Sequence, residues 1–370
     1  MIGSSTAAEG DSVKAAVKGW EKKTGNEVTV QIAQDLNQQL GQSLAGGEPP
    51  DVFYVSSDQF ANYADGGSLY PYGDRLDDAA KFSEGLRASF THDGKLVCVP
   101  KDSSTLALAI NTDLWKQAGL TDADIPENWQ DLQSVAAKLT DGKVTGLVFD
   151  PTYNRIGAFM KQNGGWITNT GQTKMTADSA ANLKALQFVQ EMLKKGTLKY
   201  SKQVDAGWGG EAFGKGRAAM TIEGNWLVGA LSHDFPDVDY RLVELPAGPA
   251  GKGTLSFSTC WGVAKKSAHH KAAVDLVRSL TSAKQQMTFA KAFGVMPSRT
   301  DALADYRKQF PDKAAFVAGT KYGQGPVTLP GFDKVLKQFD TDLATLRTGD
   351  PAKMLEELQR NGEQAMESGR

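Results

Sequence analysis

The chain has 370 residues, which is enough for two hydrophobic cores, because a single core seldom grows beyond about 250–300 residues. Its 41 basic and 43 acidic side chains give a formal net charge of -2, which argues against a nucleic-acid or anionic-membrane surface and favours small, nearly neutral partners. No apolar run reaches the ~18 residues of a membrane span, and no charged segment followed by an apolar one marks a signal peptide.

The first hundred or so positions alternate helical and strand-like patterns. Apolar residues at helical spacing predict helices over residues 9–24 and 36–44, and an alternating pattern predicts a strand over residues 28–32. A buried strand at 51–55 follows, and then a short helix that ends before Gly66. This order predicts a mainly parallel sheet with helices on both faces.

The remainder of the chain repeats the pattern and predicts a second α/β lobe. The polar run 101–105 separates two predicted strands and resembles a crossover between lobes. An extended apolar segment returns at 254–264, and the tail from 332 to 368 is largely helical. Further strands are expected at 95–100, 106–111 and 144–149, and further helices at 113–117, 129–139, 178–195, 271–281 and 284–293.

The glycine-rich stretch that begins at Gly209 nearly satisfies G-x-x-x-x-G-K-[S/T], the loop that cradles nucleotide phosphates. Such a loop follows a strand and opens a helix, because the helix N-terminus supplies the amide donors. Here the order is reversed: residues 205–213 predict a helix, Gly214 and Gly216 a left-handed exit, and residues 217–223 a strand. The pattern therefore argues against a nucleotide site.

The polar residues give weak support for catalysis and none for a metal or cofactor. The histidines, at positions 92, 233, 269 and 270, stand in surface-like contexts, and no metal-ligand spacing occurs. Asp58, Asp102 and Glu223 each lie at the end of a predicted element. Capping or hydrogen bonding to a sugar hydroxyl is at least as good an interpretation as proton transfer, so a glycoside hydrolase stays a secondary alternative.

Three tryptophans stand beside Gly or Asn where elements should end: Trp208, Trp226 and Trp261. A tryptophan at a loop edge suits the apolar face of a pyranose, while neighbouring polar side chains bind its hydroxyls. The other interpretation is that these rings only cover the core. The residues alone leave both open.

The chain has two cysteines, Cys98 and Cys260, each in an apolar, strand-like stretch. A pair of buried free thiols and a disulfide are both compatible with this pattern.

Several segments together resemble one family, the extracellular solute-binding proteins of sugar-importing ABC transporters, of the maltose-binding type. The segments that carry the resemblance are Trp20–Val30, Pro50–Phe60, Asp93–Pro100, Asn111–Trp115 and Glu211–Trp226. The resemblance implies an α/β, two-lobe periplasmic-binding-protein fold (type II, Venus flytrap), in which each lobe is a sheet flanked by helices. Residues 1–102 plus 257–308 would form the N-terminal lobe, and residues 103–256 plus 309–370 the C-terminal lobe, with hinges near 102–106, 255–261 and 305–312.

The same resemblance implies a function that is not enzymatic. The chain would capture a carbohydrate, an oligosaccharide above all, in the cleft between the lobes and deliver it to a membrane permease by closure. We expect a monomer without a cofactor, extracellular or periplasmic, whose lipid anchor or signal peptide is absent from this chain. The abrupt start at Met1, partway through a first strand, fits that expectation.

The resemblance also assigns site residues. Trp226 matches a tryptophan that stacks on the sugar, Asp58 matches a carboxylate that binds hydroxyls, and Asp102 falls near a second one. Family aromatic or charged positions are replaced at Val55, Gln59 and Leu336, which puts maltose itself in doubt. The expected ligand-binding set is Trp226, Asp58, Trp208, Trp261, Asp102, Ser103, Ser104, Tyr153, Glu223, Asn225, Arg299 and Phe332.

Two further points follow from the resemblance. Cys98 and Cys260 would lie on neighbouring strands of the first lobe, which modestly favours the disulfide. A binder of another polar solute, such as a phosphodiester, would share the fold but have a more cationic site, for which Arg155 and Arg299 are the candidates.

Overall fold

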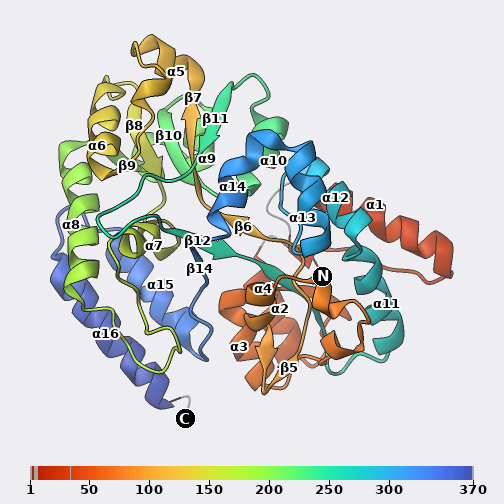
Figure 1. Ribbon diagram of the computed structural model, residues 1–370. Coiled ribbons are helices and arrows are strands. Elements are labelled where there is room, and N and C mark those ends of the chain that lie inside the picture. Colours follow the sequence, from red (N-terminus) through yellow and green to blue (C-terminus); the bar gives the residue numbers. More distant parts are fainter. Residues whose placement is uncertain (1, 4–6, 34, 369–370) are drawn as a thin grey trace. The chain divides into compact units, whose positions relative to one another are not determined.

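The computed structural model describes residues 2–3, 7–33 and 35–368, and its chain forms two compact units (Figure 1). Unit 1 comprises Met1–Ser104, Val228–Ala230 and Phe257–Phe310; unit 2 comprises Thr105–Leu227, Leu231–Ser256 and Pro311–Arg370. The short segment 228–230, which joins unit 1, was not anticipated.

Unit 1 is built around the antiparallel strands β3 (Val52–Ser56) and β13 (Thr259–Val263), which pair from Val52↔Val263 to Ser56↔Thr259. Helices α1 (Ala7–Thr24), α11 (His270–Leu280) and α12 (Ala283–Phe293) pack against one another. The mainly parallel sheet expected here is wrong, because β13 returns antiparallel to β3, and the parallel pair β1–β2 is only two residues long. The remaining elements of the unit are β1 (Ile2–Gly3), β2 (Ile32–Ala33), α2 (Leu36–Ala45), α3 (Ser57–Asp65), α4 (Glu84–Ala88), β4 (Thr91–His92), β5 (Lys95–Leu96) and α13 (Thr300–Gln309).

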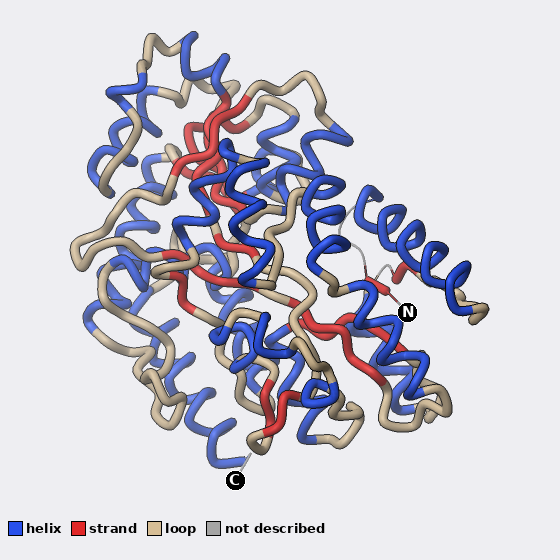
Figure 2. Tube along the Cα trace, turned by 45° about the vertical axis from the view of Figure 1, so that its right-hand side comes forward, coloured by secondary structure: helices blue, strands red, loops and turns tan. Residues whose placement is uncertain are grey.

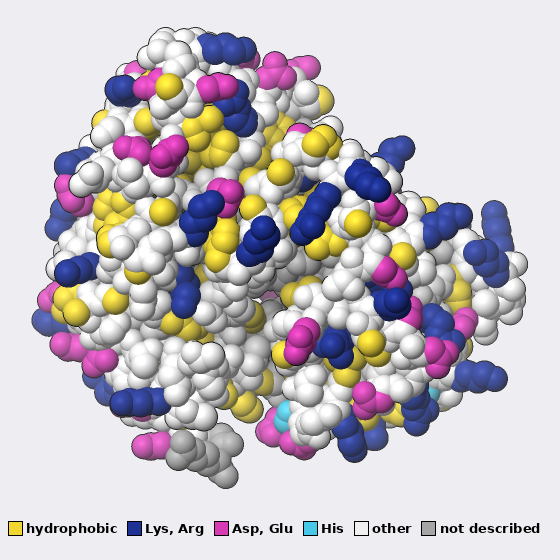
Figure 3. Space-filling view, in the orientation of Figure 1, with side chains coloured by type: hydrophobic (Ala, Val, Ile, Leu, Met, Phe, Trp, Pro, Cys, Tyr) yellow, Lys and Arg dark blue, Asp and Glu magenta, His cyan; other side chains and the backbone are white. Residues whose placement is uncertain are grey.

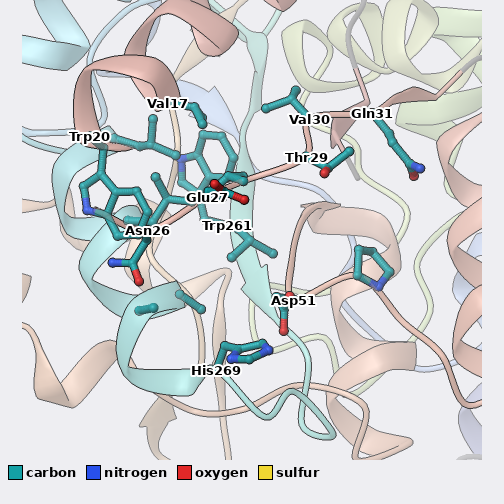
Figure 4. A pocket seen from close by; sticks show the side chains of 17 residues that line it. Val17, Trp20, Asn26, Glu27, Thr29, Val30, Gln31, Asp51, Trp261 and His269 are labelled. Atoms are coloured by element: carbon teal, nitrogen blue, oxygen red, sulfur yellow. The ribbon is translucent and has the colours of Figure 1, made fainter. Parts of the chain in front are cut away.

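The strand predicted over residues 28–32 forms only at its end, as β2. Val28 and Val30 are half-buried, and Thr29 and Gln31 are exposed, so the side chains alternate as in a strand. Residues 26–31 instead border a groove of about 520 Å³ that Trp20 of α1 and Trp261 of β13 also line (Figure 4). Among the described residues no neighbouring strand pairs with 28–31, which explains why the alternating pattern does not become a ladder.

Unit 2 contains a five-stranded sheet in the order β11-β7-β10-β8-β9, whose strands lie side by side in Figure 2. β8 (Thr145–Phe149) pairs parallel with β10 (Ala218–Glu223) and β9 (Leu198–Tyr200), whereas β7 (Ala107–Asn111) is antiparallel to β10 and β11 (Tyr240–Val243). All residues of β7, β8 and β10 are buried, as expected for strands covered on both faces.

The helices of unit 2 surround this sheet. α15 (Phe332–Leu343) packs against α16 (Pro351–Ser368), and α7 (Tyr153–Gln162) and α16 both pack against α8 (Ala180–Lys195). The remaining elements of unit 2 are α5 (Thr112–Gln117), α6 (Trp129–Lys138), α9 (Gly209–Gly214), α14 (Ala314–Gly319), β14 (Gly323–Gln324) and short 3-10 turns at 122–124, 201–204 and 311–313. Three elements, α10 (Trp226–Asp234), β6 (Ser104–Thr105) and β12 (Thr254–Phe257), contain residues of both units, and the 3-10 turns at 73–75 and 79–81 belong to unit 1.

Cys98 and Cys260 form a disulfide within unit 1, with Cα atoms 5.8 Å apart and a sequence separation of 162. Both lie in the hydrophobic core that also holds Phe53, Tyr72 and Trp261. The bond therefore connects the two sequence-distant parts of the unit.

The distribution of charge on the surface agrees with the nearly equal numbers of basic and acidic residues. On the face shown in Figure 3, basic and acidic side chains are interspersed. Within the described part of the chain, no helix combines the length and the apolar character that a membrane crossing needs.

Candidate ligand-binding site

The stretch that resembled a phosphate loop is a helix, a turn and a strand, in that order. α9 ends at Gly214, Gly216 has the left-handed φ of 67° that the exit requires, and β10 begins at Ala218. The order confirms the argument against a phosphate cradle. The helix begins at Gly209 rather than near residue 205, because Asp205 has a φ of 51° and Trp208 is extended.

At the end of β10, three side chains form a connected cluster, which we call the Trp226 cluster: Trp226, Glu223 and Arg155. Trp226 Nε1 donates to Glu223 Oε2 over 2.8 Å, and Arg155 Nη2 donates to the same oxygen over 2.6 Å. The Arg155 guanidinium carbon also lies 5.4 Å from the centre of the Trp226 ring, within cation–π range. The indole is thereby fixed by a charged pair, while its ring is only half-buried.

The charged pair is buried. Glu223 is 0% exposed and Arg155 is 9% exposed. Glu223 Oε1 and Arg155 Nε are both buried and have no hydrogen-bond partner within the described residues. Burial raises the pKa of Glu223, the Arg155 charge opposes this shift, and the carboxyl of Asp150 adds to it.

Gly209 allows α9 to start directly over this pair. A Cβ atom at position 209 would lie 2.8 Å from Glu223 Oε1 and 2.7 Å from Thr221 Oγ1, so only glycine fits. Gly210 similarly leaves room for the ring of Trp208, which is half-buried and precedes α9. The two tryptophans expected to bind ligand in unit 2 thus flank one helix–turn–strand motif.

Three other predicted residues of unit 2 are buried around these elements. Asn225 precedes α10, and its Oδ1 accepts a hydrogen bond from the Thr105 backbone N–H over 3.4 Å. Tyr153 begins α7 and is 6% exposed; its backbone N–H donates to Asp340 Oδ1 over 2.6 Å. Phe332 is fully buried at the start of α15, which is a core position.

In unit 1, Asp102 belongs to a buried ionic network. Lys101 Nζ lies 2.8 Å from Glu9 Oε1 and also contacts Asp102 Oδ2, and Tyr54 Oη donates to Glu9 Oε1 over 3.1 Å. Burial lowers the pKa of Lys101, but the carboxylates of Asp102 and Glu9 outweigh it and hold this pKa well above its usual range. Burial raises the pKa of Asp102, and Lys101 only partly opposes that shift.

Strand register brings Asp102 to the same sheet edge as Asp58. The Lys101 N–H donates to the Thr259 carbonyl over 2.7 Å, and Thr259 pairs with Ser56 at the end of β3. Asp58 follows two residues later, half-buried in the first turn of α3. Ser103 and Ser104 are buried, and Ser103 pairs with Met296.

Two residues of unit 1 that were predicted to bind ligand, Trp261 and Arg299, make contacts within the protein instead. Trp261 is fully buried and lies edge-on to Tyr54, with ring centres 4.9 Å apart. Arg299 makes a bidentate contact to Asp301, with distances of 2.9 and 2.8 Å, and also contacts Asp78. Trp261 and Phe332 are fully buried, and the Arg299 guanidinium is engaged by two carboxylates, so we leave these three residues out of the proposed site.

Residues 15–318 match the model of the bacterial extracellular solute-binding protein family. The chain belongs to this family. The match extends over most of both units and includes every residue of the Trp226 cluster.

Proteins similar to this chain in sequence or structure are known with different ligands. The diacetylchitobiose-binding protein DasA of Streptomyces coelicolor is 26% identical over 330 residues, which cover 84% of this chain and 75% of the relative. The substrate-binding protein Lmo0181 of Listeria monocytogenes, solved with cycloalternan, has a TM-score of 0.89 at 24% identity, covering 99% of this chain and 97% of that one.

A third similar structure has a different kind of ligand. UgpB of Mycobacterium tuberculosis, solved with glycerophosphocholine, has a TM-score of 0.86 at 17% identity, covering 99% of this chain and 98% of that one. These likenesses confirm the two-lobe fold of the solute-binding proteins.

Sequence reasoning missed Lys101 and Glu9 and the partnership of Arg155 with Glu223. Glu9 lies 92 positions from Lys101 and Arg155 lies 68 positions from Glu223, and no local pattern connects such positions. Only Glu223, at the end of an apolar strand-like stretch, stood out locally as a charged residue in an apolar context.

Proposed function

We propose that this solute-binding protein captures a carbohydrate, most readily an oligosaccharide, and delivers it to the membrane permease of an ABC importer. The observation that carries the proposal is the Trp226 cluster, a half-buried indole fixed by hydrogen bonds at the end of a sheet strand. A relative named for diacetylchitobiose and a similar structure solved with cycloalternan support the ligand class.

The chemistry of the cluster suits a sugar ring. The C–H face of a pyranose stacks on an indole, and burying such an aromatic contact is worth roughly 1–3 kcal/mol. Asp58, in the other unit, remains our proposed acceptor for sugar hydroxyls, and Trp208 a second aromatic surface.

A phosphodiester ligand is the second candidate, favoured by the similarity to UgpB. The cations expected for it are engaged, since Arg299 binds Asp301 and Asp78 and Arg155 binds Glu223. This engagement favours the carbohydrate.

The test is a titration monitored by tryptophan fluorescence with diacetylchitobiose, maltotriose, cycloalternan and glycerophosphocholine. We expect saturable binding of at least one sugar, and we expect Trp226→Ala to weaken it by roughly 1–3 kcal/mol. Trp226→Phe, which keeps an aromatic face, is the matched variant and should retain most of the affinity. Equal affinity in a folded Trp226→Ala protein would disprove the role of this ring, and binding of glycerophosphocholine alone would favour the second candidate.

Three finer predictions stay open to test. Attachment to the cell surface by a lipid would be seen by fractionation of the producing cells. Closure of the two units on the ligand would decrease the radius of gyration that small-angle scattering measures when ligand is added. Incubation with each sugar followed by product analysis would reveal a hydrolase, which we do not expect.

A further inference from the structure

The Arg155–Glu223 pair has a consequence for the charge of the ligand. Arg155 carries a permanent positive charge next to Trp226, which by itself would attract anions. Glu223 lies 2.6 Å from it, and the pair is nearly removed from solvent. In such a low-dielectric setting the carboxylate cancels the field of the guanidinium at short range.

Glu223 cannot act as a direct ligand contact in this arrangement. Its Oε2 already accepts from Trp226 and Arg155, and its Oε1 is buried next to Gly209, where even a Cβ atom would lie only 2.8 Å from it. The side chain is 0% exposed, so a solute that stacks on the indole does not reach it. The expectation that Glu223 itself binds sugar is therefore replaced by a positioning role.

Two further carboxyl groups, those of Asp150 and Asp340, lie near the start of α7. Asp150 interacts electrostatically with Glu223 and accepts a hydrogen bond from Ser201 Oγ over 2.6 Å. Asp340 accepts from the backbone N–H of Tyr153 at the start of α7, the helix that carries Arg155. Of these two, Asp150 acts electrostatically on Glu223, whereas Glu223 is the carboxylate in direct contact with Arg155.

We propose that Glu223 is a specificity-determining residue: it holds Trp226 in place and cancels the charge of Arg155, so that the site selects uncharged solutes and rejects anions. The inference rests on the proposed function, and it assigns the selection to a buried group that never touches the ligand. An unpaired charge in a binding site is a recognised determinant of which partner the site accepts, and Glu223 prevents Arg155 from being such a charge.

The first experiment does not require a known ligand. Iodide and caesium quench exposed tryptophan fluorescence but carry opposite charge, so their quenching ratio at Trp226 reports the local potential. The Trp226 signal is isolated by subtracting the Trp226→Phe protein in each background, at constant ionic strength and about pH 8, where carboxyl groups are normally ionised.

We expect Glu223→Gln to raise the iodide-to-caesium ratio, Arg155→Gln to lower it, and the double variant to return it near the wild-type value. Glu191→Gln is the matched control, because Glu191 is an exposed partner of Lys195 on α8. If Glu223→Gln does not fold, Arg155→Gln still tests the inference. An unchanged ratio in the folded variants would overturn it.

The second experiment measures selectivity. Wild-type protein should bind diacetylchitobiose and not glycerol 3-phosphate, and Glu223→Gln should improve the ratio of phosphate to sugar affinity roughly tenfold, the effect of ~1.4 kcal/mol. Tight phosphate binding by the wild type would overturn the inference. Failure to bind any sugar would count against the proposed function, while the quenching ratio would still decide the role of Glu223.

Discussion

Lys101 is the residue on which the buried network of unit 1 depends. It contacts two carboxylates, Glu9 and Asp102, and both it and Glu9 are nearly inaccessible to solvent. Removing one partner of a buried ionic pair leaves a charge in a medium that solvates it poorly, which usually costs more than the pair contributes.

We predict that Lys101→Met destabilises the protein by about 3–5 kcal/mol at neutral pH, measured by urea unfolding. Lys101 has a raised pKa, so its contribution is fully present below about pH 10 and is lost only as the pH rises through the folded value. The orphaned carboxyls of the variant become neutral in acid, so the deficit should shrink below about pH 5. Lys116→Met, at an exposed lysine, is the control; equal stability of the two variants would refute the prediction.

At the scale of elements, two helical glycines differ in their surroundings: one is limited only by helix propensity, and the other is required by close packing. Gly19 lies inside α1, exposed, and an alanine Cβ there would have no atom within 4 Å, whereas Gly209 begins α9 against Glu223 and Thr221. The same substitution should therefore have opposite effects at the two positions.

We predict that Gly19→Ala stabilises unit 1 by about 0.5–1 kcal/mol, because alanine restricts the unfolded chain and suits a helix interior. Gly209→Ala should destabilise unit 2 by about 1–3 kcal/mol through overpacking, and it should weaken sugar binding because it displaces Glu223. Thermal unfolding and the fluorescence titration measure both effects. A neutral Gly209→Ala variant with normal binding would show that α9 shifts freely over the pair.

The elements also show what the sequence could predict. Helix α8 was expected at 178–195 and forms at Ala180–Lys195, because its apolar residues recur at helical spacing and are buried on one face. The strand at 28–32 failed for lack of a partner, and pairing is a property of distant segments that alternation does not record. Trp226 could be proposed as a site residue because its motif is local. The burial of Trp261 and the ion pair of Arg155 depend on residues distant in the sequence, so they could not be predicted.

At the scale of the whole molecule, unit 1 is assembled from distant parts of the chain, and the Cys98–Cys260 disulfide joins them across most of unit 2. In the chain-entropy model, closing a loop of this length stabilises the folded state by about 5 kcal/mol. That figure assumes that the whole loop is unfolded with unit 1. If unit 2 remains folded while unit 1 unfolds, it shortens the effective loop, and the contribution of the disulfide is smaller.

We therefore predict that reduction lowers the unfolding transition of unit 1 by up to roughly 10 °C and leaves that of unit 2 in place. Calorimetry with and without reductant measures this, and the Cys98→Ala/Cys260→Ala protein, which should not respond to reductant, is the control. Gly19→Ala and Gly209→Ala assign the transitions, because each substitution lies in only one unit. A single transition that moves as a whole on reduction would mean that the units unfold together, and the full loop would then determine the contribution of the disulfide.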